Sequence, residues 1–475
     1  MSSNTKKSQS REGGWKRKAI TRANENRQLR KNVTRISRDR DRYKKIAAKA
    51  NPSAQQDDIQ TVVPLQGKEQ LVFLALQLFL TARIGYRAVS RVLQVLAPYL
   101  GLKKTPCPQT IINWVARLSI VKLQQLVPMP SAQRRLCGDP FSNGMIWMMD
   151  TSIGLGAGKI LAILALDYRH HQTNDGAPTL RNVSCVGIAV AVSWTGIDIA
   201  NFLQKIIAVM GRPAAFLKDG GKDLQKATEI LNDRKFYSLN IADISHVIAN
   251  LFKHEYGESP LLASFLTICG QASKNLKQSI LACLAPPKVS VKSRFMNLHR
   301  LVAWAERVLK FSPVGRVAED SIVAKLRKSL NQLPECRAFV VRFLRDAVPL
   351  LACQKILKVN GLSTQTYLEC EALLAPLPTN SPIRLGFMQW AEEQREVAQR
   401  LELTDQGLPV CSDLIESLFG VGKRHGAGET KDAQQIAKRL AAECGEITPA
   451  DARLVLDGVH YEFLDTLGGL IASTI

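Results

Sequence analysis

Several features are missing from this 475-residue chain, and each absence excludes a class of protein. No apolar stretch exceeds about 12 residues, which is too short to span a bilayer. The N-terminus is polar and lacks the apolar segment of a signal peptide, so we predict a cytoplasmic protein with no membrane partner. The ten cysteines are scattered, without a CxxC pair or zinc-like Cys/His spacing. We therefore expect reduced, mostly buried thiols and no structural zinc.

A nucleotide-binding phosphate loop is also missing. Residues Gly154 to Lys159 contain three glycines beside a lysine. The Walker pattern, however, needs four residues between its first glycine and Gly-Lys, and then Ser or Thr, whereas Ile160 follows Lys159. We predict a glycine-rich hairpin here, and a loop at His170 and His171, rather than an ATPase or a metal site.

Acidic residues are scarce relative to basic ones. The chain has 64 Lys and Arg against 41 Asp and Glu, a net charge of +23, and residues 1–50 alone contribute +13. An excess of this size favours salt-dependent binding to a polyanion such as DNA. Residues 15–50 have the spacing of one basic helix, which is either a solvated single helix or a helix or short coiled coil lying on DNA phosphates. Residues 51–67 resemble a linker, so we assign 1–67 to a tail, helix and linker.

Residues 68–130 are rich in leucine at helical spacing, and we expect three helices, near 68–82, 88–96 and 108–118. In the third, Ile111, Ile112, Val115 and Leu118 should face inward. The outward set should be Gln109, Thr110, Asn113, Trp114 and Arg117. A polar second helix that carries an arginine is typical of a helix-turn-helix DNA-binding domain, whereas an ordinary three-helix packing unit is the alternative.

Residues 140–254 change character. Short apolar runs at 145–149, 160–166, 183–192, 214–217 and 236–241 are bounded by turn residues and predict strands, with helices at 196–210 and 224–231. The first three strands can form a meander, and the others a parallel crossover. This is the order of a ribonuclease-H-like α/β domain. Residues 255–410 show only helical patterns, with separate helices expected at 276–283, 337–348 and 351–357 among others, which predicts a large all-helical insertion. Residues 411–475 resume with a helix carrying Glu416 and two C-terminal helices.

Three acidic residues carry the chemistry in this interpretation. Asp150 and Asp219 each end an apolar, strand-like run, and Glu416 lies on a helix followed by Lys423 and Arg424. Hard divalent cations prefer oxygen ligands, and a pair of Mg²⁺ ions can clamp both the attacking and the leaving oxygen of a phosphodiester. We predict that Asp150, Asp219 and Glu416 are catalytic and bind two Mg²⁺ ions, with Mn²⁺ as a substitute. An isolated Asp is more often a turn or cap residue, so the prediction depends on the trio.

With these residues in this order, the chain resembles the DDE transposases of bacterial insertion sequences, in the ribonuclease-H-like superfamily. The resemblance covers about 144–254 and 405–430, and more loosely the N-terminal helices. It implies that Asp150 bridges both metal ions while Asp219 and Glu416 hold one each. One subgroup has a Tyr-Arg-Glu-Lys signature. Glu416 and Lys423 have its spacing, but Pro409 and Ser412 stand at the Tyr and Arg positions.

The resemblance also implies partners and supporting residues. Lys423 and Arg424 would hold a phosphate of the terminal nucleotides. Transposases often have an Asp/His pair near the site, which here would be Asp243 and His246, although Asp243 could equally cap the helix that follows it. The N-terminal helices, through Thr110, Asn113 and Arg117, would read the terminal inverted repeats. A homodimer or higher assembly would synapse two ends and join the freed 3′-OH to target DNA.

Two alternatives remain open at this point. The chain could be a transposase-derived DNA-binding regulator that has lost catalysis, which the intact carboxylate trio disfavours. It could also be a metal-dependent nuclease or resolvase of the same superfamily. The helical insertion and the N-terminal helices favour transposition, because a simple hybrid nuclease needs neither.

Overall fold

The computed structural model describes residues 65–125, 144–152, 158–168, 176–289, 294–310, 315–319, 321–424 and 432–457, and ten helical positions between 27 and 42. The side chains of Gln124, Arg294 and Arg424 are outside this description. One compact unit comprises residues 1–64 and 98–102, and the other comprises the rest of the chain. In the first unit, Val33 of the basic helix is exposed, which fits both a solvated helix and a helix that lies on DNA. Residues 153–157 of the predicted glycine hairpin, the His170–His171 loop and the linker up to residue 64 lie outside the described residues. The two strands that flank the hairpin pair antiparallel, as predicted.

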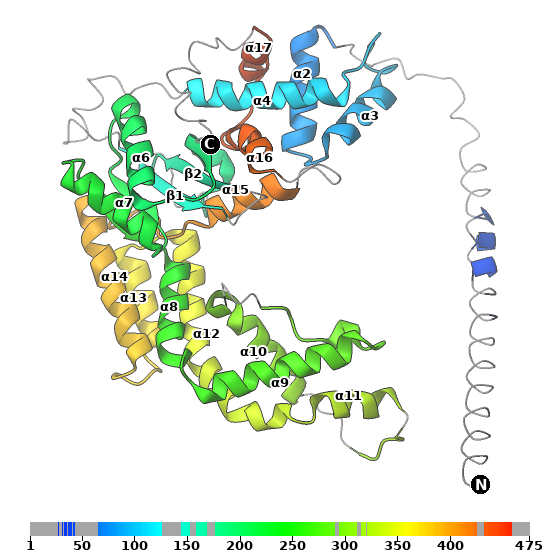
Figure 1. Ribbon diagram of the computed structural model, residues 1–475, viewed down its shortest axis with the longest axis vertical. Coiled ribbons are helices and arrows are strands. Elements are labelled where there is room, and N and C mark those ends of the chain that lie inside the picture. The colour runs from blue at the N-terminus through cyan, green and yellow to red at the C-terminus, as the bar shows by residue number, and fades with distance from the viewer. Residues whose placement is uncertain are drawn as a thin grey trace, which may run out of the picture. The chain divides into compact units, whose positions relative to one another are not determined.

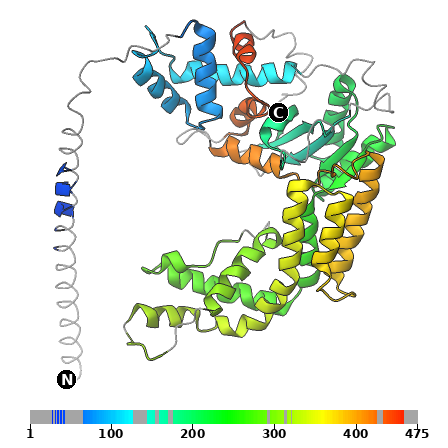
Figure 2. The same cartoon turned by 180° about the vertical axis from the view of Figure 1, so that it is seen from behind.

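The second unit contains the three predicted N-terminal helices. They are α2 (Lys68–Leu80), α3 (Tyr86–Leu96) and α4 (Pro108–Gln124). Pro108 begins α4, a position where its missing N–H costs nothing. Their shared core also takes in Ala442 from η5 (Ala441–Glu443) and Ala452 and Val455 from α17 (Pro449–Asp457). Helix α16 (Ala433–Leu440) packs on α4. Helix α17 packs on both α2 and α4, as both views show (Figure 1, Figure 2).

A five-stranded mixed sheet is the second feature of this unit. Its strands are β1 (Ile146–Thr151), β2 (Lys159–Leu166), β3 (Val183–Ala191), β4 (Ala215–Lys218) and β5 (Leu239–Ala242), in the spatial order β3-β2-β1-β4-β5. Strands β1, β2 and β3 pair antiparallel, and β4 and β5 continue parallel to β1. This is the meander with a parallel crossover that the sequence predicted, and the molecule is a mixed α/β protein with far more helix than strand.

Alternate strand residues face two separate cores. Trp147 and Met149 point to the face covered by α6 (Gly196–Met210) and α7 (Lys222–Asp233). A short 3-10 helix, η2 (Leu180–Asn182), precedes β3. Ile146 and Met148 point to the opposite face, whose core extends through α8 (Ile244–Tyr256) into the helical region. Local residues set both ends of helix α6. The Thr195 side chain caps its start, and Gly211, which has a positive φ, follows its last residue.

The expected insertion is helical throughout its described residues, apart from one isolated β-bridge between Leu362 and Leu408. Its elements are α9 (Pro260–Lys277), η3 (Ala282–Leu284), α10 (Arg294–Lys310), α11 (Ile322–Leu330), η4 (Leu333–Cys336), α12 (Arg337–Asn360), α13 (Thr364–Leu374) and α14 (Pro382–Arg400). Helices α12, α13 and α14 run side by side in both views (Figure 1, Figure 2). The next helix is α15 (Asp413–Arg424). No described helix is both long and apolar enough to cross a bilayer.

Several details of the helical predictions were wrong. Helices expected at 337–348 and 351–357 form the single helix α12, which continues through Pro349. A separate helix expected at 276–283 does not form, because α9 extends to Lys277 and a short 3-10 turn follows. Trp114 of α4 is buried in the N-terminal core rather than facing outward, since the C-terminal elements cover a second side of that helix.

Candidate active site

Three aspartates stand in a row at one edge of the sheet. Met149 of β1 pairs with Lys218 of β4, which pairs with Ala242 of β5, so Asp150, Asp219 and Asp243 are the next residues on three adjacent strands. Neighbouring strands are about 4.8 Å apart. All three aspartates share the parity of strand residues in the larger core, so their side chains leave the sheet on the face opposite α6 and α7.

Asp150 is the most perturbed of the three. It is half-buried, and its Oδ1 accepts a 2.6 Å hydrogen bond from the backbone N–H of Thr151. Burial and then the negative charge of Asp219 raise the pKa of Asp150 to about 7, with the Thr151 bond and His246 acting in the opposite direction. Glu416 adds a smaller repulsion to the same carboxyl. The negative charge of Asp219, and more weakly that of Glu416, therefore acts on the carboxyl of Asp150.

Asp219 is held by the turn that follows β4. The backbone N–H of Gly221 donates to Asp219 Oδ1 over 2.9 Å. A Cβ at position 221 would lie 2.8 Å from that same oxygen, so this turn needs a glycine. His246 Nδ1 is 4.0 Å from Asp219 Oδ2. The predicted supporting histidine thus lies beside the second aspartate, on the first turn of α8.

Asp243 uses both of its carboxylate oxygens inside the protein. Oδ1 caps α8 by accepting the His246 backbone N–H at 3.0 Å. Oδ2 accepts the backbone N–H of Ser412 at 2.6 Å and its hydroxyl at 2.8 Å. With 2% of its surface exposed, Asp243 is a buried junction that ties the start of α8 to the segment entering α15. The capping role considered for Asp243 from the sequence is therefore confirmed.

Glu416 lies one turn into α15, and its side chain is exposed. Partial desolvation and the neighbouring Asp413 raise the pKa of Glu416. Lys423 follows seven residues later, which places it on the same helix face about 10 Å along the axis. The side chain of Arg424 is outside the described residues.

The donor chemistry of this edge suits a hard cation. Asp150 and Asp219 offer carboxylate oxygens from adjacent strands, and their mutual repulsion is the effect that a divalent ion would relieve. Within the described part of the chain, no three His, Cys, Asp or Glu side chains are already close enough to form a metal site. Binding of Mg²⁺ by Asp150, Asp219 and Glu416 thus requires their side chains to close in, and it stays a prediction.

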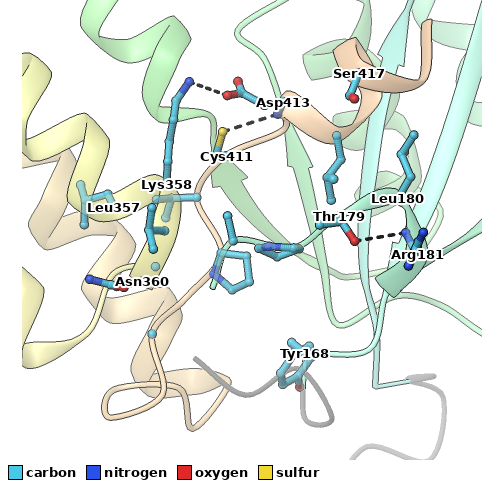
Figure 3. Close-up of a pocket in the computed structure, with 18 of the residues that line it drawn as sticks. Tyr168, Thr179, Leu180, Arg181, Leu357, Lys358, Asn360, Cys411, Asp413 and Ser417 are labelled. Carbon is cyan, nitrogen blue, oxygen red and sulfur yellow. Dashed lines mark hydrogen bonds and ion pairs between the residues drawn. The ribbon is translucent and has the colours of Figure 1, made fainter. Parts of the chain in front are cut away.

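One interaction near the site was not foreseen from the sequence. Lys358, near the end of α12, forms a 2.5 Å ion pair with Asp413, the first residue of α15 (Figure 3). Together they line a cavity of about 670 Å³ that also contains Tyr168, Arg181 and Asn360. Lys358 and Asp413 were not singled out because 55 residues separate them and neither belongs to a motif.

The predicted DNA-reading residues of α4 have different surroundings. Gln109 and Asn113 are exposed and hydrogen-bonded to each other at 3.1 Å, and Thr110 is half-buried. Arg117 is exposed, but its guanidinium donates a 3.4 Å hydrogen bond to the Val455 carbonyl of α17. The polar surface of α4 that remains accessible therefore centres on its first two turns.

Comparison with known proteins yields little. No family model matches the chain, and none of the curated proteins does. Among solved structures, the chain is similar to the Drosophila P element transposase strand transfer complex, with a TM-score of 0.39 and 12% identity over 86% of this chain and 97% of that one. A likeness at this level carries no argument, so the function proposed below depends on the residues of the site.

Proposed function

We propose that this chain is a metal-dependent DNA transposase of the DDE type, which cleaves DNA at the ends of its element and transfers the 3′-OH into target DNA. The narrower assignment to a bacterial insertion sequence remains a prediction. The observation that carries the proposal is the row of Asp150 and Asp219 on adjacent strands, and Glu416 adds a small repulsion at Asp150. The net charge of +23 supports a DNA substrate.

The side chains have distinct roles in this proposal. Asp150 and Asp219 from the sheet, and Glu416 from α15, would hold two Mg²⁺ ions. Such ions stabilise the charge that develops on the attacking and leaving oxygens. His246, beside Asp219, would orient the scissile phosphate by donating a hydrogen bond. Lys423, on the Glu416 face of α15, would bind a neighbouring phosphate, as would Arg424.

Residues next to the proposed metal ligands support this arrangement. Asp243 sets the start of α8 and, through Ser412, the start of α15. His246 lies three residues after Asp243, and Glu416 lies four residues after Ser412, so the junction adjoins the first turn of each helix that carries a proposed site residue. Binding of the terminal repeats by the exposed first turns of α4, through Thr110 and Asn113 with Arg117 nearby, completes the proposal. Synapsis of two ends would require at least a dimer.

The test is cleavage of DNA that carries the flanking ends of the gene, with Mg²⁺ or Mn²⁺, by the wild-type protein and by Glu416→Ala. We expect metal-dependent cuts at the element boundary that disappear in the variant. Sequence-specific binding without cleavage by either protein would favour a regulator. Cleavage that ignores the element ends would favour a nuclease, and cleavage unaffected by the substitution would remove Glu416 from the site.

A further inference from the structure

A second cavity, of about 430 Å³, opens directly beside Glu416. Four helices supply its walls: α8, α10, α12 and α15. Two of these, α10 and α12, belong to the helical insertion. The polar part of the lining consists mainly of Ser245, Asn297, His299, Arg300, Gln354 and Lys358. The insertion therefore forms one side of the candidate active site.

The insertion helices are held firmly against the catalytic part. Helix α10 packs on both α8 and α12. Gln354 of α12 donates to the Ser245 hydroxyl of α8 over 3.1 Å, and Lys358 one turn later pairs with Asp413. The cavity wall is thus built from fixed helices, and its side chains keep a defined position relative to Glu416.

The charged side chains of the cavity differ in whether they already form an ion pair. Asp413 is already paired with Lys358, which leaves Glu416 as the accessible acid. Burial, together with the adjacent Arg300, lowers the pKa of His299, so its imidazole is neutral near pH 7. Arg300 is exposed at the rim, and among the described residues no ion pair engages its guanidinium. A guanidinium in this position matches a phosphate well.

The lining is mainly polar. Ile248 and Phe252 of α8 also border the cavity, but both are almost completely buried in the core behind it. The cavity volume lies near the lower end of the range for small-ligand sites. The polar side chains suit the hydrogen-bonding edge of a nucleobase, and the phosphate of a nucleotide fits Arg300. A DNA duplex cannot enter a cavity of this volume.

We propose that this cavity binds one nucleotide of the DNA strand that lies next to the scissile phosphate, with its phosphate on Arg300 and its base against the polar side chains of α10 and α12. The inference rests on the proposed function and extends it, because it gives the helical insertion a role in binding the substrate strand. Asn297 and Gln354 supply the neighbouring hydrogen-bonding groups. The proposed ligand is therefore single-stranded DNA, which the cavity would recognise through a phosphate.

The experiment compares Arg300→Gln with Arg307→Gln. Both remove one exposed positive charge from α10, but Arg307 lines a different cavity and donates to the Ala303 carbonyl of its own helix. A fluorescein-labelled thymidine oligonucleotide is titrated in CaCl₂ over a series of salt concentrations. We expect Arg300→Gln to bind about tenfold more weakly, with a salt slope smaller by about 0.7, and Arg307→Gln to change less. Thymidine 5′-monophosphate should compete with the oligonucleotide for the wild type better than thymidine does.

Equal affinities and salt slopes for the two variants would overturn the inference. If the wild type still cuts element ends with Mg²⁺ while Glu416→Ala does not, the proposed function survives that outcome. A wild-type protein that neither binds nor cuts DNA would overturn both. Because Arg300 is a surface residue, unchanged urea unfolding midpoints would confirm that either variant is folded.

Discussion

Replacing Asp150 by Asn should stabilise the metal-free protein while abolishing its activity. The pKa of Asp150 rises from 3.8 to about 7, chiefly through burial and the charge of Asp219. A tenfold difference in proton affinity between the folded and unfolded states corresponds to about 1.4 kcal/mol. Because the pKa rises from 3.8 to about 7, which is a little more than a thousandfold in proton affinity, the ionised carboxyl costs at most about 4 kcal/mol of folding free energy at pH 8. Side-chain relaxation reduces this, and we expect a gain of about 2–4 kcal/mol. Asn can still accept the Thr151 hydrogen bond through Oδ1.

The pH dependence follows from the direction in which the pKa of Asp150 moves. A raised pKa contributes stability that is fully present below the unfolded value, near 3.8, and is lost as pH rises through the folded value near 7. At pH 5 the carboxyl costs only about 1.5 kcal/mol, so the advantage of Asn should shrink between pH 8 and pH 5. Above pH 8 the advantage should stay constant.

The measurement is urea unfolding in EDTA at pH 5 and pH 8, followed by the same titration in saturating MgCl₂. Asp405→Asn, at an exposed position, is the matched control and should change the unfolding free energy by less than about 0.5 kcal/mol. Magnesium should stabilise the wild type more than Asp150→Asn, because binding to the folded state alone adds stability. An Asn variant no more stable than the wild type at pH 8 would refute the electrostatic argument.

Three further predictions concern the surrounding framework. Ser412→Ala removes one of the two bonds to Asp243 Oδ2, so it should cost about 1 kcal/mol in urea unfolding and lower the cleavage rate more than DNA affinity. Trp114→Ala should cost about 3–5 kcal/mol of stability, whereas Asn113→Ala on the same helix should leave stability unchanged and weaken binding to terminal repeats in a gel-shift assay. Hydrogen bonds from Lys122 and from the Thr448 backbone lower the pKa of Asp451 despite its burial, so its stabilisation is present above about pH 4 and is lost as pH falls further. Asp451→Asn should therefore show a shallower loss of stability between pH 5 and pH 3, measured by thermal unfolding.

The sequence predicted the sheet well because its signals are local. Runs of apolar and β-branched residues bounded by turn residues located all five strands, and helix α6 matched its predicted limits of 196 and 210. Asp150 and Asp219 were placed at strand ends for the same reason. Their common face and register are shown only by the strand pairing in the structure.

Other features depend on contacts that no local pattern shows. Pro349 suggested a break in α12, but burial of Ala347 and Leu350 on either side keeps the helix continuous. Trp114 was expected outside because the elements that cover it lie more than 300 residues later. The second oxygen of Asp243 finds Ser412 across 169 residues, and neither residue alone signals that bond.

The packing of α17 and η5 onto α2 and α4 has a consequence for how the chain folds. Residues 68–125 would leave a synthesising ribosome about 300 residues before the helices that complete their core. At roughly 5–20 residues per second, this delay lasts tens of seconds. During that interval the apolar surface around Val115 and Leu118 lacks its cover from Ala442 and Val455. The nascent N-terminal helices therefore need protection from aggregation, or a temporary partner, until the last part of this core is made.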